Sequence, residues 1–130
     1  VIGVPLGNIA LAMARLADPD PHLPPARAAA AKRVLGAMAA EPFLVAGSGR
    51  FCTRVMEVAG AKVVLKTGAE GVYAASLPTL GLGVALIVDD GAGRAAEVAM
   101  GGVLRHLDLL DDDEEAALAE AFRPADGSEA

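Results

Sequence analysis

Aromatic residues, cysteine and long apolar runs are scarce in this sequence, and each scarcity excludes a class of function. Phenylalanine, tryptophan and tyrosine make up 3% of the 130 residues, which argues against a stacking platform for single-stranded nucleic acid. The formal charge of −6 argues against a phosphate-backbone partner. We recognise no signal peptide and no apolar run of membrane-spanning length. One cysteine excludes an internal disulfide and fits a reducing compartment, so we expect a cytoplasmic protein with neither nucleic-acid nor membrane partners.

Motifs for an activated serine are also absent. No Ser-x-x-Lys occurs, because Ser48 is followed three positions later by Phe51 and Ser76 by Thr79. Gly-x-Ser-x-Gly does not occur either. These motifs mark the nucleophiles of several families of serine hydrolases. The chain therefore carries no convincing serine nucleophile of its own.

The single cysteine and the two histidines do not form a metal-binding pattern. His22 and His106 lie far apart, and neither has ligand-like spacing to Cys52, so we expect no metal site within this chain. Cys52 lies early in a predicted short helix, where a thiol pKa can fall and a nucleophile is conceivable. Because no histidine is near it in sequence, we favour the alternative that Cys52 is a small core residue.

Composition and periodicity favour one α+β domain. The residues are 54% hydrophobic, and a chain of this length can bury a modest core of Ala, Val and Leu. Residues 43–46 form a short apolar stretch, either a strand or a buried loop. We assign residues 1–110 to the domain and 111–130 to a short acidic helix with a disordered tail from residue 123. Helical spacing and breaks at proline or glycine predict helices over residues 5–17, 26–40, 50–59, 92–107 and 111–122.

Three strand candidates lie over residues 61–67, 72–77 and 82–88. The connections 68–71 and 78–81 are too short for a helical crossover and suit hairpins. We therefore expect a three-stranded antiparallel meander packed with helices.

The triplet Lys66-Thr67-Gly68 is the strongest local signal of chemistry. Lys66 places one charge at the end of an apolar run, with a hydroxyl and a glycine directly after it. An ammonium and an O–H in this position can face an anionic ligand, and the glycine allows the ligand to approach the strand backbone. Class A β-lactamases and penicillin-binding proteins use the same triplet beside their nucleophile. The alternative is an exposed strand end that runs into a turn.

Two further segments offer charged or anion-binding groups. Gly47-Ser48-Gly49 precedes a predicted helix and could cradle an anion, or could be a plain glycine turn capped by Ser48. Arg50, directly after it, is a candidate cleft residue. Glu70 could orient Lys66 or stabilise its own turn, and we favour the turn. The pair Asp89-Asp90 could bind a cation, although capping the helix that follows is the simpler interpretation.

Several stretches together resemble the C-terminal part of the L-asparaginase II family of rhizobial type. The resemblance runs from residue 1 to about residue 107. It is carried by four stretches in the same order, namely Val45–Thr53, Lys66–Tyr73, Gly81–Leu86, and Asp89–Gly91 with Arg94–Glu97. Because several motifs coincide in order, this resemblance is far more specific than the triplet alone.

The resemblance implies a fold similar to serine β-lactamases and glutaminases, and hydrolysis of L-asparagine to L-aspartate and ammonia. It implies a serine nucleophile in a Ser-x-x-Lys motif upstream of Val1. It also implies a metal site, possible for zinc, with ligands in upstream Cys-Ser-Gly-Lys and Asp-Gly-Cys-Gly segments. Within this chain only Lys66-Thr67-Gly68 maps onto the family's active-site wall, which implies catalytic roles for Lys66 and Thr67 and a substrate contact for Gly68. Arg50 and Glu70 are further candidate substrate contacts, which the resemblance itself does not assign.

The sequence also departs from the family pattern. Ile87 stands where the family usually has lysine, and Glu41-Pro42 where it often has His-Pro. One alternative is a non-catalytic α+β binding or assembly module, and another is a glutaminase or a penicillin-interactive protein on the same fold. For the preferred interpretation we expect a small-molecule substrate and a homo-oligomer.

Overall fold

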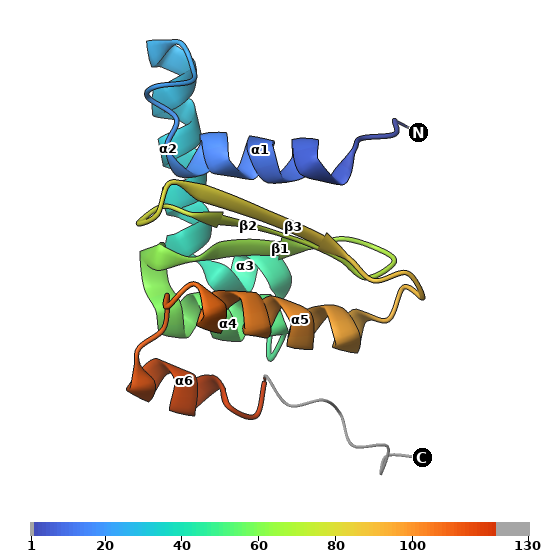
Figure 1. The fold of residues 1–130 in the computed structure, drawn as a ribbon. Coiled ribbons are helices and arrows are strands. Elements are labelled where there is room, and N and C mark those ends of the chain that lie inside the picture. The colour runs from blue at the N-terminus through green and yellow to red at the C-terminus, as the bar shows by residue number, and fades with distance from the viewer. Residues whose placement is uncertain (1, 122–130) are drawn as a thin grey trace.

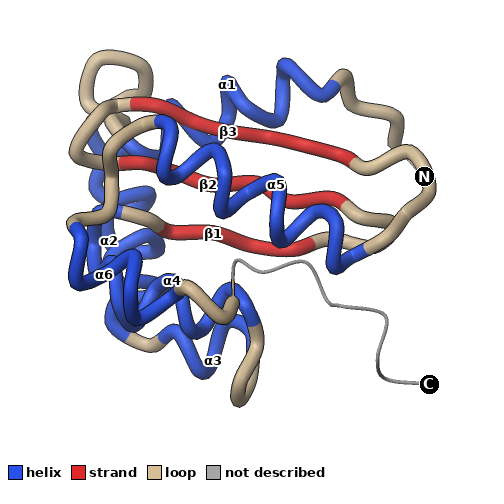
Figure 2. The backbone as a smooth tube through the Cα atoms, turned by 60° about the horizontal axis from the view of Figure 1, so that its bottom comes forward, coloured by secondary structure: helices blue, strands red, loops and turns tan. Residues whose placement is uncertain are grey.

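The computed structural model describes residues 2–121 and has three layers (Figure 1). A three-stranded antiparallel sheet forms the middle layer. Helix α1 (Leu6–Ala17) covers one face, and helices α4 (Phe51–Ala59) and α5 (Gly93–His106) cover the other. The predicted α+β class and the packing of helices on a meander are confirmed. Figure 2 shows α5 lying across the sheet, seen from that second face.

The sheet has the order β1-β2-β3, with strands Val64–Thr67, Val72–Leu77 and Leu82–Ile87. The prediction that β1 begins at residue 61 is wrong, because Gly60–Lys62 forms a 3-10 turn (η1) and Val63 donates its N–H to the Gly60 carbonyl. The third strand ends one residue earlier than predicted. The N–H of Val88 still donates to Gly71, its partner in register, but the Val88 carbonyl accepts the N–H of Gly91 in the following turn.

Helix α1 approaches the sheet closely because a strand position facing it has no side chain. A Cβ added to Gly83 on β3 would overlap the Ala10 carbonyl and the Ala14 N–H of α1. The buried hydroxyl of Ser76 on β2 donates to the Met13 carbonyl over 2.8 Å. Small residues and one hydroxyl therefore attach α1 to this face of the sheet.

Helix α2 (Pro25–Ala40) stands beside one end of the sheet (Figure 1). The helix that follows, α3 (Pro42–Ala46), corrects the prediction of a strand or buried loop over 43–46. Proline suits the first position of a helix because its φ is preset and it needs no N–H partner. Phe43 and Leu44 are not buried but 56% and 76% exposed.

The main core lies between the sheet and α4 and α5. Phe51, Val55 and Met56 of α4 are at most 5% exposed, as the predicted short helix requires. Gly60 ends α4 with φ of 58°, as the sequence indicated. Leu118 of the acidic helix α6 (Asp112–Leu118) is buried in the same hydrophobic cluster.

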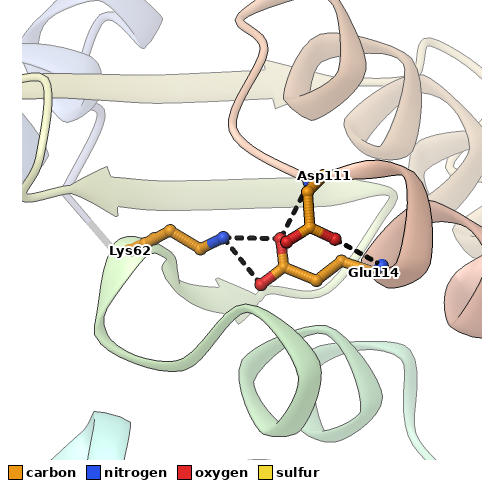
Figure 3. A network of polar contacts seen from close by, with 3 residues as sticks. All are labelled: Lys62, Asp111 and Glu114. Atoms are coloured by element: carbon orange, nitrogen blue, oxygen red, sulfur yellow. Dashed lines mark hydrogen bonds and ion pairs between the residues drawn. The ribbon is translucent and has the colours of Figure 1, made fainter.

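A polar network joins α6 to the turn before β1 (Figure 3). Lys62 donates to both carboxylate oxygens of Glu114, over 2.6 and 2.5 Å. One of these oxygens also accepts the Asp111 N–H, while the Asp111 carboxylate accepts the Glu114 N–H, each over 2.9 Å. The acidic segment is therefore a capping box tied to a lysine.

Candidate active site

The Lys66-Thr67-Gly68 triplet occupies the end of β1 and the start of the turn to β2. Val64 and Leu65 are buried, whereas Lys66 is exposed, so the charge emerges where the strand leaves the core. The Lys66 ammonium donates to the carbonyl of Thr67 over 2.9 Å. This end of β1 therefore presents an ammonium at the surface, next to a backbone carbonyl.

Lys66 and Thr67 lie on opposite faces of the sheet. Successive side chains along a strand alternate between faces, and Lys66 pairs with Ala74 whereas Thr67 pairs with Tyr73. Because Tyr73 reaches Glu97 of α5, Thr67 lies on the α5 face and Lys66 on the α1 face. The Thr67 hydroxyl donates to the Gly68 carbonyl over 3.1 Å.

The turn after the triplet is built from residues with unusual backbone conformations. The Gly68 N–H donates to the Val72 carbonyl over 2.8 Å, and Gly68 itself is exposed. Glu70 has φ of 59° and Gly71 has φ of 68°, both in the left-handed region. A Cβ added to Gly91 would lie 2.9 Å from the Glu70 carboxylate. The structure thus places the Glu70 side chain over the β3–α5 connection.

Arg50 is exposed and forms the N-cap position of α4. The interpretation of Ser48 as the cap is wrong, because no side chain caps this helix. Instead the Thr53 hydroxyl, one turn into α4, donates to the Gly47 carbonyl over 2.6 Å and closes the glycine turn. Sequence reasoning missed Thr53, although a hydroxyl in the first turn after a Gly-Ser-Gly segment is a recognisable signal.

Contrary to the expectation from the sequence, Asp90 does not cap α5 itself. Its carboxylate accepts the Ala92 N–H over 2.9 Å, in the turn just before α5. Ala92, not Asp90, is the N-cap residue, and no side chain caps α5. Asp90 therefore supports the approach to the helix rather than its first turn.

Cys52 lies behind the triplet, in the first turn of α4. Its side chain is 1% exposed. Burial raises the pKa of the Cys52 thiol, and the Thr67 backbone, the Lys66 charge and a hydrogen bond with Tyr73 oppose that rise only in part. A buried thiol with a raised pKa is largely protonated near neutral pH and is a poor nucleophile. The core-packing interpretation therefore suits Cys52 better than the nucleophilic one.

Tyr73 and Glu97 are a polar pair that sequence reasoning missed. The Tyr73 side chain is 2% exposed, and its hydroxyl donates to a Glu97 carboxylate oxygen over 3.1 Å. Its ring meets Phe51 edge-on, with centroids 5.7 Å apart. Burial is the largest cause that raises the pKa of the Tyr73 phenol. Cys52 and Glu97 raise this pKa further, whereas a hydrogen bond with Thr67 lowers it. The available signal was the hairpin register, which places this sole tyrosine opposite Thr67.

Two further properties bear on cofactors and membranes. Within residues 2–121, no three side chains of His, Cys, Asp or Glu come together as a metal-binding group. The zinc implied by the family resemblance therefore has no ligand set of this kind within the described residues. None of the helices in the same part of the chain is long and apolar enough to cross a membrane.

Comparison with known proteins decides the family. A family model described as L-asparaginase II matches residues 1–129. The chain belongs to the L-asparaginase II family. Membership indicates amidohydrolase activity, in general the hydrolysis of asparagine, on a small-molecule substrate. The match continues beyond residue 107, where the recognisable motifs end, and so includes α6. A search of curated proteins returned no match.

Proposed function

We propose that this chain forms one wall of an asparaginase active site whose serine nucleophile lies in a segment upstream of Val1. The observation that carries the proposal is the position of Lys66. A lysine at the exposed end of an otherwise buried strand, followed by Thr67 and Gly68, offers positive charge and a close backbone approach to a small anionic substrate. Membership of the L-asparaginase II family favours asparagine as that substrate.

The arrangement of the elements supports a nucleophile from upstream. Helix α1 begins at the same end of the sheet as the β1–β2 turn, and both views agree on this (Figures 1 and 2). Lys66 lies on the face of the sheet that α1 covers. A segment that leads into α1 would therefore approach the sheet on the side and at the end where Lys66 lies.

In the proposed reaction, the upstream serine oxygen attacks the side-chain amide carbon of asparagine. The C–N bond then breaks, and the nitrogen leaves as ammonia with a proton that originates from the serine. Water hydrolyses the resulting ester, releases aspartate and returns the proton to the serine oxygen. Lys66 would hold the substrate carboxylate and stabilise the negative charge that develops during both attacks.

The neighbouring residues would complete the wall. Thr67, on the opposite face of the edge strand β1 from Lys66, would donate or relay a hydrogen bond at the open edge of that strand. Gly68 would keep the backbone close to the substrate. Arg50 and Glu70 are the proposed outer substrate contacts, on the segment before α4 and on the β1–β2 turn respectively.

Lys66→Ala in a polypeptide that carries both the upstream segment and this chain tests the proposal. We expect kcat/KM for asparagine to fall about 10²- to 10³-fold, as when one charge-stabilising donor is removed from an acyl-transfer site. Lys32→Ala is the matched control, because Lys32 is an exposed lysine that pairs with Asp20 on a distant loop. Near wild-type turnover by Lys66→Ala would overturn the assignment. Parallel assays with glutamine distinguish an asparaginase from a glutaminase on this fold.

A further inference from the structure

We infer that Tyr73 and Glu97 are positioning residues that hold Thr67 in the active-site wall. This inference rests on the proposed function, because it gives these two residues a task in the reaction assigned to the triplet. Neither residue belongs to the Lys66-Thr67-Gly68 segment, and Glu97 comes from a helix on the far side of the sheet from α1.

The strand register places Tyr73 beside Thr67. Thr67 and Tyr73 are direct partners in the antiparallel β1–β2 pair. Directly opposed side chains on one face of such a pair lie within contact distance. The only side-chain hydroxyl on the strand end that is proposed to touch substrate therefore lies beside a buried phenol.

The phenolic proton of Tyr73 has a defined direction. The Tyr73 hydroxyl donates to Glu97 over 3.1 Å, so its proton points toward α5. A phenol that donates in one direction keeps its oxygen lone pairs available to other donors. Thr67 lies directly across the strand pair from Tyr73, and a hydrogen bond with Thr67 lowers the pKa of the phenol. Because the phenolic proton goes to Glu97, the Tyr73 oxygen is open to a donor from the wall residue.

The Thr67 hydroxyl has competing partners. It lies 3.1 Å from the Gly68 carbonyl in the turn and 3.4 Å from the Val72 carbonyl at the start of β2. Without the Tyr73 oxygen, these carbonyls alone would direct the hydroxyl. The edge-on contact between Tyr73 and Phe51 fixes the ring, so the phenol oxygen is held by α4 and α5 together. The pair therefore holds a third oxygen acceptor in a fixed place beside Thr67, in competition with the two carbonyls.

The experiment compares Tyr73→Phe, Glu97→Gln and Glu97→Leu in the active polypeptide described above. Tyr73→Phe removes only the hydroxyl, and we expect kcat to fall about tenfold while KM changes less than twofold. Glu97→Gln keeps an oxygen acceptor for the phenol and should stay within about twofold of wild-type kcat. Glu97→Leu removes the acceptor and should match Tyr73→Phe. The double variant Tyr73→Phe/Glu97→Leu should have a kcat no lower than that of either single variant, because the two residues act as one unit.

Ser76→Ala is the matched control on the same strand. It also removes a buried hydroxyl that donates one hydrogen bond, but on the α1 face and toward the Met13 carbonyl. We expect it to lower Tm without changing kcat, whereas a positioning role predicts the kcat loss of Tyr73→Phe at temperatures well below Tm. Wild-type kcat in Tyr73→Phe, or equal losses in Glu97→Gln and Glu97→Leu, would overturn the inference.

These experiments distinguish a failure of the positioning role from a failure of the proposed function. If Lys66→Ala abolishes activity and Tyr73→Phe leaves kcat unchanged, only the positioning role fails. If Lys66→Ala retains activity, the proposed function fails, and the positioning role fails with it.

Discussion

The Lys62 ammonium donates to both carboxylate oxygens of Glu114, which lies 52 positions later in the chain (Figure 3). The two side chains are 34% and 18% exposed. The contact links α6 to the turn that precedes β1, the strand that ends at Lys66. Because Glu114 also accepts the Asp111 N–H, this one carboxylate supports both the helix cap and the link.

The first prediction concerns this link. Glu114→Ala removes the partner of Lys62 and half of the capping box, so we expect the free energy of unfolding to fall by about 1–2 kcal/mol, after allowing for solvent screening. Chemical denaturation at neutral pH measures the change. Glu120→Ala, which removes an exposed charge just after α6, should stay within about 0.5 kcal/mol of wild type. Equal effects of the two substitutions would show that the link contributes nothing specific.

The second prediction concerns the contact between α1 and β3. Gly83→Ala would drive a Cβ into the backbone of α1. Because both sides of that contact are backbone, we expect a loss of about 2–3 kcal/mol in stability. Gly36→Ala is the control, since nothing lies within 4 Å of its added Cβ on α2. That control should gain about 0.5–1 kcal/mol from helix propensity. Thermal unfolding of both variants checks the prediction, which a stable Gly83→Ala protein would contradict.

The third prediction concerns alkaline pH. Folding raises the pKa of the Cys52 thiol above its ordinary value of 9.0 and that of the Tyr73 phenol above 10.0, in both cases chiefly through burial. The unfolded chain therefore loses these protons first as the pH rises. The stability that both groups contribute is fully present below pH 9.0 and declines above it.

Urea unfolding at pH 7 and pH 10 measures this decline. We expect wild-type stability to fall between the two pH values, and Cys52→Ala to show a shallower fall because one of the two titrating groups is gone. Identical pH dependence in the variant and the wild type would show that the thiol does not contribute.

Much of the fold could be predicted because it is encoded locally. The strand Val72–Leu77 was predicted with its observed bounds, because the turn-forming residues Gly71 and Pro78 flank it. The short connections required hairpins, so the meander and the position of Lys66 at a strand end followed from spacing. The β1 start was missed because Gly60–Lys62 continues as a helical turn, which an apolar pattern does not reveal.

The remaining features depend on contacts between distant segments. Sequence reasoning placed Thr67 beside Lys66 but could not show that Tyr73 and Glu97 meet behind it, since they lie 24 positions apart on different elements. The helix Pro42–Ala46 was missed because an apolar run of five residues suits either a strand or a helix.

By itself, the sequence determined most of the helices and strands, the hairpin order and the location of the triplet, because period, turn residues and connection length act over a few neighbouring positions. The tertiary structure alone decided which face of the sheet Lys66 and Thr67 each occupy relative to α1 and α5. It also decided that Cys52 is buried behind the strand that carries Lys66 and Thr67. The physical reason is that burial and hydrogen-bond partners depend on how helices far apart in the chain pack on the sheet.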